Sequence, residues 1–165
     1  MKACFKSSYS KGMLLATSVL SVVIVVALVL MGLQLANASA GSMAFMVYVA
    51  AFVLVFAAAV YAFVSQIDSV CLTSSDIIIN KKVGRIVIPK KNIVHMAHKP
   101  SMSGDIRLCG VGGLFGRTGL FWSKGLGRYE AYVKDGNSLI EIKTTGKTYV
   151  VSCDNYQQLL SSVNA

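Results

Sequence analysis

Few side chains in this sequence have the types and the spacing that catalysis requires. His95 and His98 are three residues apart in a segment that predicts a strand, so their side chains are expected on opposite faces, which suits neither one metal ion nor one acid–base pair. Ser123 has glycines nearby but lacks the G-x-S-x-G setting of a hydrolase nucleophile. The acidic residues are scattered, without the spacing of paired catalytic carboxylates. We therefore predict that the protein is not an enzyme.

A glycine-rich segment is the next candidate for chemistry. Eight glycines lie between Gly104 and Gly127, interleaved with aromatic residues and with Arg117. Backbone N–H groups of such a segment can surround a phosphate, but Val111 stands where a P-loop needs its first glycine, and Arg117 stands where it needs a lysine. The favoured interpretation is structural: the glycines permit bends and bulges in strands, and the aromatic side chains fill the core. No cofactor is predicted.

Four cysteines complete the set of reactive side chains. They are Cys4, Cys71, Cys109 and Cys153, and they form neither a C-x-x-C pair nor the spacing of metal ligands. No metal site is predicted. In a reducing cytoplasm, where we place the domain below, they are expected to be free thiols.

The elements that position these residues begin with a membrane anchor. The chain is 55% hydrophobic and only 14% charged, with a mean hydropathy of +0.62, which excludes an ordinary water-soluble domain. No charged residue occurs from Gly12 to Ile67. The sequence predicts a basic tail over residues 1–11, a transmembrane helical hairpin over residues 12–66 and one domain over residues 67–165.

Two apolar runs in the hairpin are long enough to cross a membrane. Residues 12–35 and 43–64 each exceed a hydrocarbon core of about 30 Å at a rise of about 1.5 Å per residue. The connector over residues 36–42 is uncharged, whereas bases precede the first run and follow the second, which predicts that the tail and the domain are cytoplasmic. A competing interpretation is that residues 1–40 are a secretory signal, because residues 36–40 resemble small-residue cleavage sites. The apolar run is longer than the usual core of a signal.

The domain changes from continuous apolar runs to alternation with a period of two, which predicts strands. Asp135-Gly136 fits a two-residue hairpin turn, and Thr145-Gly146 marks another reversal. The predicted strands cover residues 70–73, 76–80, 85–88, 93–98, 129–134, 139–143 and 148–152.

A helix is predicted after the last strand. Asp154 can act as its N-cap, and Tyr156, Leu159, Leu160 and Val163 form one apolar stripe. One amphipathic helix after antiparallel strands predicts two antiparallel sheets, or a partly open barrel, closed by that helix. The predicted fold class is therefore an α+β membrane protein, with a two-helix transmembrane hairpin followed by a mainly-β domain.

Five segments of the domain resemble the bacterial pleckstrin-homology-like (PH-like) domains, which are often found behind membrane spans. They cover residues 88–93, 107–116, 119–122, 127–132 and 147–152. The resemblance implies a seven-stranded PH-like fold closed by a C-terminal helix, in a protein of the bacterial inner membrane. Asn92 and Cys153 depart from the family pattern, in which an acidic residue and a proline are common there. The helix lacks the tryptophan of eukaryotic PH domains, so phosphoinositide recognition is not carried over.

Basic and aromatic side chains supply the candidate binding sites. Each base near an anionic leaflet contributes about 1 kcal/mol, enough to orient a tethered domain, although a solvated basic face explains the same cluster. The candidate lipid or anion contacts are Lys81, Lys82, Arg85, Lys90 and Lys91. The candidate partner contacts are Arg117, Phe121 and Trp122. The segment GLFGRTGLFW is similar to the aromatic strand of an RNA-recognition motif, but the helices of that fold are missing, so nucleic acid is not a predicted partner.

These observations predict a non-catalytic, membrane-anchored binding or scaffold module that presents a basic domain to a protein partner or to anionic lipid head groups. An extended segment of a partner can add to an exposed sheet edge. The alternative is a structural subunit of a homo-oligomer or of a larger membrane assembly. Loss of a copurifying partner on mutation of Phe121, Trp122 or the basic cluster favours binding, whereas a discrete ring that survives those changes favours assembly.

Overall fold

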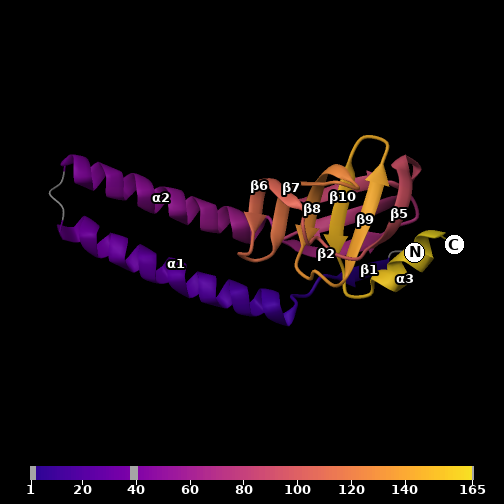
Figure 1. The fold of residues 1–165 in the computed structure, drawn as a ribbon, viewed down its shortest axis with the longest axis horizontal. Coiled ribbons are helices and arrows are strands. Elements are labelled where there is room, and N and C mark those ends of the chain that lie inside the picture. Colours follow the sequence, from indigo (N-terminus) through magenta and orange to yellow (C-terminus); the bar gives the residue numbers. More distant parts are fainter. Residues whose placement is uncertain (1–2, 38–40, 165) are drawn as a thin grey trace.

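The computed structural model describes residues 3–37 and 41–164 and shows an elongated molecule in two parts (Figure 1). The α1 helix (Lys11–Asn37) and the α2 helix (Met43–Val64) form an antiparallel hairpin that projects from one end of a β-rich domain. Both helices are long and apolar enough to cross a membrane, and they coincide with the two predicted spans. Large apolar side chains are exposed along both helices, as expected for surfaces that face lipid. The candidate cleavage sites include residues 38–40, which lie outside the described residues.

The domain contains two sheets, the α3 helix (Tyr156–Asn164) and the short 3₁₀ helix η1 (Lys90–Asn92), which links the sheets. The first sheet has the strand order β1 (Ala3–Lys6), β2 (Ile67–Leu72), β3 (Asp76–Lys81), β4 (Arg85–Pro89). The second sheet has the strand order β5 (Ile93–Lys99), β9 (Leu139–Thr144), β10 (Thr148–Ser152), β8 (Gly127–Val133), β7 (Arg117–Ser123), β6 (Ile106–Gly112). The predicted fold class, a two-helix hairpin followed by a mainly-β domain with two sheets and a C-terminal helix, is confirmed.

Alternation along the strands divides the apolar side chains between two clusters. The larger cluster takes side chains from both sheets and the fully buried Leu159 from α3. Consecutive residues of the second sheet belong to different clusters: Val151 and Ile140 lie in the larger one, whereas Val150 and Leu139 lie in the smaller one. Because consecutive strand residues point to opposite faces, both faces of the second sheet are buried. This sheet is therefore the rigid centre of the domain.

The apolar stripe predicted for α3 is confirmed, but its predicted cap is wrong. The other three residues of the stripe pack against the larger cluster around Leu159. The carboxylate of Asp154 does not bond to the helix. It accepts a hydrogen bond from the backbone N–H of Ser8 at 2.8 Å and another from the Ser8 hydroxyl at 2.7 Å. Asp154 therefore ties the segment before α1 to the far end of the chain.

The hairpin predicted at Asp135-Gly136 is also wrong. β8 and β9 are not neighbours, because β10 lies between them and pairs in parallel with β8 and antiparallel with β9. The Asp135 carboxylate instead accepts hydrogen bonds from the Asn137 backbone N–H at 3.1 Å and from the Ser138 hydroxyl at 3.2 Å. These bonds hold a wider turn, which lets the chain step across the width of one strand. The second sheet is therefore mixed rather than wholly antiparallel.

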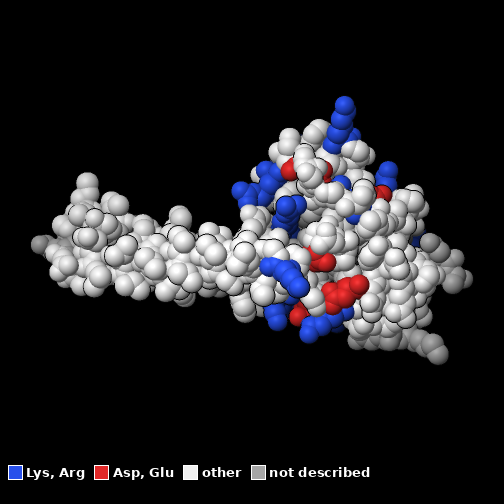
Figure 2. Space-filling model, turned by 60° about the horizontal axis from the view of Figure 1, so that its bottom comes forward, with Lys and Arg blue, Asp and Glu red and all other residues white. Residues whose placement is uncertain are grey.

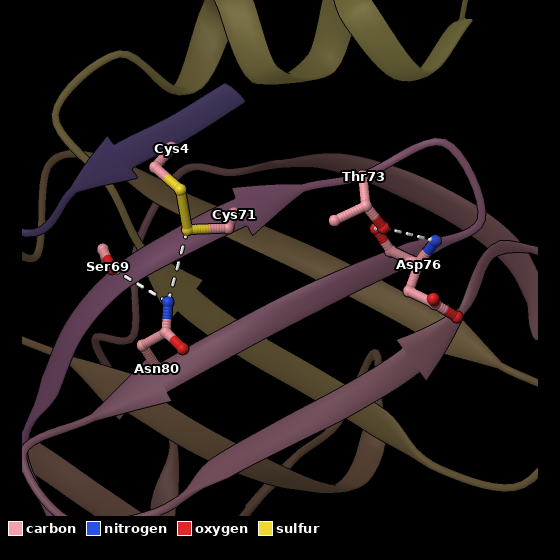
Figure 3. Close-up of a disulfide and its surroundings, with 6 residues drawn as sticks. All are labelled: Cys4, Ser69, Cys71, Thr73, Asp76 and Asn80. Carbon is pink, nitrogen blue, oxygen red and sulfur yellow. Dashed lines mark hydrogen bonds between the residues drawn. A yellow bond between two sulfur atoms is a disulfide. The ribbon is translucent and has the colours of Figure 1, made fainter. Parts of the chain in front are cut away.

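The basic tail contains a strand that the sequence patterns did not reveal. β1 pairs antiparallel with β2, and Cys4 lies opposite Cys71. These two cysteines form a disulfide (Figure 3), which corrects the expectation of four free thiols. Cys109 is free and exposed, while Cys153 is free and buried, and burial raises the pKa of the Cys153 thiol to about 12. Because β1 precedes α1 and β2 follows α2, the pairing of these strands holds both ends of the hairpin together at the domain.

Two glycines bring β6 and β7 into close contact. Gly110 lies opposite Gly119, and both have positive φ angles, 118° and 129°. A Cβ atom on Gly119 would lie 2.3 Å from the carbonyl oxygen of Cys109, which is shorter than any real contact. The ladder also shifts its register between Arg107 and Cys109. The interpretation that the glycine-rich segment serves strand geometry is confirmed at these positions.

Candidate functional site

Three of the predicted lipid contacts lie where the domain meets the helical hairpin. Lys81, Lys82 and Arg85 surround the β3–β4 turn, in which the backbone N–H of Val83 donates to the carbonyl of Val64 at 3.1 Å. Figure 2 shows Lys and Arg side chains gathered around this end of the domain. Val64 ends the apolar α2 helix, so these bases lie next to the end of a helix that is long and apolar enough to cross a membrane. We call Lys81, Lys82 and Arg85 the membrane-proximal bases.

The other two predicted lipid contacts lie at the opposite end of β4. Lys90 and Lys91 belong to η1, which begins directly after that strand. A five-residue strand spans roughly 13–17 Å, so this distal pair is set back from the hairpin by about that length. The structure therefore divides the predicted basic cluster into two groups that cannot contact one flat membrane surface in the same way.

The three predicted partner contacts share the β7 strand but not one surface. Phe121 is 4% exposed, and its ring stacks on that of Tyr129 with the centroids 6.0 Å apart. Trp122 is 39% exposed and lies opposite Ile106 of β6. Arg117 is half-buried beside the β6–β7 turn. Because Phe121 is buried, we leave it out of the candidate contact surface.

The exposed edge of the second sheet is a stronger candidate surface. Among the strands that the structure describes, β6 pairs only with β7, so the backbone groups on its outer side are open to another strand. Ile106 is 55% exposed and Leu108 is 47% exposed. Together with Trp122 they form an apolar border along this strand, which we call the β6 edge. The sequence patterns missed both β6 and β7 as strands, because the glycines in them resemble a loop.

The β6–β7 turn also reaches the hairpin. The backbone N–H of Phe115 donates to the Thr17 hydroxyl at 3.2 Å, and that hydroxyl donates to the Gly113 carbonyl at 3.4 Å. The rings of Phe63 and Phe115 meet edge-on with the centroids 5.6 Å apart. The sequence signal for this contact is weak, because Thr17 is one of several small polar residues in a mostly apolar helix. The contact joins the domain to both helices.

A buried ionic network lies on the same sheet. The Asp105 carboxylate lies 3.1 Å from the Lys99 ammonium and accepts a hydrogen bond from the Tyr129 hydroxyl at 2.5 Å. Burial, followed by this bond to Asp105, raises the pKa of Tyr129. Because the Asp105 carboxylate is held by both of these partners, the network stabilises the fold rather than offering a free acid or base.

The two histidines do not converge on one site. His95 lies 3.9 Å from Glu141, whereas the ring of His98 stacks on that of Tyr156 with the centroids 4.7 Å apart. Within residues 3–37 and 41–164, no group of three or more His, Cys, Asp and Glu side chains is placed to hold a metal ion. The candidate site residues that remain are the membrane-proximal bases and the exposed side chains of the β6 edge.

Comparison with known proteins identifies the family of the domain. The family model of the bacterial PH domain matches residues 68–165, which is the whole domain that follows the hairpin. No curated protein and no solved structure matches the chain.

Proposed function

Because the chain belongs to the bacterial PH domain family, we propose that it is a non-catalytic binding or scaffold module held at a bacterial inner membrane by its helical hairpin. PH domains act through surfaces that contact proteins or lipids. In this chain, the proposed partner is a protein segment that binds in extended form along the β6 edge.

The β6 edge is the observation that carries this proposal. It combines a strand whose outer side is unpaired with exposed apolar side chains, and strand addition uses both features. An exposed apolar edge is a liability in a protein that has nothing to cover it. The neighbouring β6–β7 turn contacts the hairpin, so a segment bound here would lie close to the membrane. The fitting partner is the juxtamembrane segment of another membrane protein.

Copurification from a mild detergent tests this proposal. We expect Ile106→Lys with Leu108→Lys to remove a partner that copurifies with the wild-type chain, because two buried charges would oppose docking on the edge. The matched control is Val94→Lys on β5, at the opposite edge of the same sheet, where Val94 is 64% exposed. A partner that stays bound to the β6 variant, or that is lost equally from the control, would contradict the proposal.

The same edge also supports the alternative of a homo-oligomer. Two β6 strands can pair with each other across a two-fold axis, and β6 carries the exposed Cys109. Under that alternative, a short bis-maleimide applied to membranes crosslinks two wild-type chains through Cys109 and fails with Cys109→Ser. A monomer in both cases, together with a heterologous partner, supports the binding module.

We place the tail and the domain in the cytoplasm. The bases that flank the helices and the uncharged connector support this side. The Cys4–Cys71 disulfide points the other way, because such bonds persist in oxidising compartments. We give more weight to the charges, since in a reducing cytoplasm the two cysteines can remain opposed as thiols on paired strands. A reporter fused after Ala165 should be active only inside the cell, and activity only outside would reverse this placement.

The membrane-proximal bases orient the domain on an anionic leaflet. Each contributes about 1 kcal/mol near such a surface, and the hairpin already supplies the attachment. Replacing all three by Glu should reduce crosslinking of the domain to anionic lipid. Replacing the distal pair, Lys90 and Lys91, by Glu is the control and should have a much smaller effect. Equal crosslinking in both variants would reject this role.

A further inference from the structure

A cavity of about 510 Å³ lies at the junction of the hairpin and the domain. Its walls come from the segment between β1 and α1, from the ends of α1 and α2 nearest the domain, and from the turns that follow β3, β6 and β8. The β6 edge takes no part in it. We call this space the junction cavity.

The polar wall of the junction cavity carries a net positive charge. Lys6, Lys82 and Lys134 line it, and Asp68 is the one acidic side chain that lines it with them. Asp68 lies 3.5 Å from Lys82, in an ion pair with both side chains about half exposed. Such a pair contributes little, and it leaves two of the three lysines without a counter-charge in the cavity.

Lys134 is the least ordinary of these lysines. The residue is only 5% exposed, and within the described part of the chain no carboxylate lies within ion-pair distance of it. Its ammonium lies 4.9 Å from the centre of the Tyr9 ring. Burial lowers the pKa of Lys134, so its charged form is costly in the empty cavity. A largely buried lysine with no carboxylate beside it favours an anion as its counter-charge.

A second unsatisfied donor lines the same cavity. Gln66 is 3% exposed, and its side-chain oxygen accepts a hydrogen bond from the Tyr9 hydroxyl. Its side-chain nitrogen Nε2 is buried and has no hydrogen-bond partner among residues 3–37 and 41–164. Buried amide donors are almost always paired in folded proteins. Because Nε2 is enclosed, an acceptor-rich group in the cavity supplies the missing partner when the Gln66 side chain turns toward that space.

The apolar part of the cavity lining comes mainly from the membrane anchor. Leu14 of α1, Phe63 of α2 and Phe115 of the β6–β7 turn form this part. Leu14 lies within one turn of the start of α1, and Phe63 lies one residue before the end of α2. The cavity is therefore at the boundary between head groups and hydrocarbon, with cations on the domain side and apolar side chains on the bilayer side. A phospholipid matches this arrangement, because its charged phosphate lies next to its apolar acyl chains.

We propose that the junction cavity binds one anionic phospholipid, with its phosphate held by Lys134 and Gln66 and its glycerol and first acyl carbons against Phe63 and Phe115. Lys6 and Lys82 attract the head group to the mouth of the cavity. This inference rests on the membrane anchoring in the proposed function but not on the β6 edge. The bound lipid would act as a structural wedge that joins the hairpin to the domain.

The test uses the full chain in a neutral detergent, with the thermal midpoint measured against added short-chain phosphatidylglycerol. We expect this lipid to raise the midpoint of the wild-type chain, because a ligand that binds only the folded state stabilises it. Zwitterionic short-chain phosphatidylcholine should do much less. Inorganic phosphate is the third arm: protection as strong as that by phosphatidylglycerol would assign the site to a soluble anion and overturn the lipid proposal.

Two variants locate the effect. Lys134→Met removes the charge but keeps most of the side-chain volume, and we expect the apparent affinity for phosphatidylglycerol to fall by about tenfold to a hundredfold, as for the loss of one charged hydrogen bond. Lys82→Gln changes an exposed residue, so folding is preserved, and it should weaken binding by about fivefold. Lys90→Met, outside the cavity, is the control and should bind as the wild type does. Unchanged affinity in both cavity variants would overturn the proposal.

The same preparations separate this inference from the proposed function. Lys134→Met should still copurify with a partner that depends on the β6 edge, and the β6 variant should still respond to phosphatidylglycerol. Lipid selectivity that survives Lys134→Met and Lys82→Gln refutes the lipid site alone. Partner capture that survives the β6 variant refutes the proposed function alone.

Discussion

At the scale of single residues, two ion pairs of similar length have different consequences. Lys99 and Asp105 lie 3.1 Å apart with side chains only 11% and 8% exposed, whereas Lys147 and Glu130 lie 2.7 Å apart with side chains 62% and 25% exposed. Water screens the second pair, so its loss changes little. Removing one member of the buried pair leaves the other charged without a partner.

We therefore predict that Asp105→Asn lowers the free energy of unfolding by about 3 kcal/mol, because it leaves Lys99 unpaired and weakens the bond to Tyr129. Denaturant unfolding in detergent measures this loss. Lys147→Met is the control and should be indistinguishable from the wild type. Similar unfolding curves for the two variants would show that burial does not separate these pairs.

Lys134 gives the protein a dependence on pH whose sign can be worked out. Burial lowers its pKa first, and Lys82 and Lys6 lower it further, while Asp68 and Asp154 oppose them. The unfolded chain keeps the ordinary value of 10.5, so between the two values the unfolded state binds more protons than the folded state. The penalty for the buried charge is complete below the folded-state pKa and disappears as the pH rises toward 10.5.

We expect Lys134→Met to have a higher thermal midpoint than the wild type near neutral pH when no anionic lipid is present. This advantage should shrink as the pH approaches the ordinary pKa of lysine, because the wild-type side chain then becomes neutral. Midpoints of both proteins across that range, in neutral detergent, check the sign. An advantage that grows with pH would show that Lys134 is not destabilising as a cation.

Gly119 shows where a glycine is required. An alanine there would place its Cβ 2.3 Å from the Cys109 carbonyl at a φ of 129°, so β6 and β7 would have to separate. We predict that Gly119→Ala lowers the free energy of unfolding by about 2–4 kcal/mol. Gly136→Ala, where no atom lies within 4 Å of the new Cβ, should stay within about 0.5 kcal/mol of the wild type. Equal stability of the two variants would mean that the strands accommodate a methyl group.

The sequence predicted only part of the candidate site, because the exposure of single side chains depends on tertiary contacts. Trp122 and Phe121 are neighbours of similar chemistry, and their exposure depends on which face of β7 is covered by the loops around Met102 and Leu126. A lysine at the end of a strand predicts a solvated side chain, so the sequence does not indicate that Lys134 is buried or belongs to a binding site. Its burial comes from the segment before α1 that folds over it, which no local pattern encodes.

At the scale of elements, strands with an alternating β-branched pattern were predictable, whereas the glycine-rich β6 and β7 and the short β1 were not. The Thr145-Gly146 turn was correct because β9 and β10 pair directly across it. The prediction of a hairpin at Asp135-Gly136 was wrong because β10 lies between β8 and β9 in the sheet. The sequence of a turn carries no information about a later strand that pairs between the two strands it connects. β1 has only four residues, in a basic tail, and its partner lies beyond two helices.

The pairing of β1 with β2 leads to a prediction about the disulfide. Cys4 and Cys71 are 67 residues apart in sequence, but the hairpin already brings its two ends together, so the bond removes less chain entropy than in a free loop of that length. We expect Cys4→Ser to lower the free energy of unfolding by about 1–2 kcal/mol. A reductant should lower the midpoint of the oxidised wild type to that of the variant.

The reductant should have no effect on Cys4→Ser itself. Cys109→Ser is the matched control: it lacks an exposed free thiol, keeps the disulfide and should respond to reductant as the wild type does. Alkylation of free thiols in intact cells measures whether Cys4 and Cys71 are oxidised there. If the domain is cytoplasmic, both are expected to be thiols. A wild type that is insensitive to reductant would show that backbone pairing alone holds β1.

At the scale of the whole molecule, β1 turns the membrane anchor into a closed unit. The chain leaves the first sheet through β1, crosses twice and returns to the same sheet through β2. Ser8 and Asp154 join this unit to the end of the domain, and Thr17 joins it to the β6–β7 turn. The hairpin and the domain are therefore joined at several points, so a lipid or a partner bound near the junction contacts both.

Because β1 and β2 are paired, the two ends of the hairpin must lie on the same side of the membrane in which it is proposed to sit. The two helices therefore take their orientation together. Bases close to the spans set such orientations, and large domains follow largely regardless of their own charge. We predict that Lys6→Gln and Lys11→Gln, combined with Ala36→Lys and Asn37→Lys, move a reporter after residue 165 toward the outer side. The first two changes alone should weaken the bias without reversing it. A reporter that stays inside in the combined variant would show that folding of the domain, rather than the flanking bases, fixes the orientation.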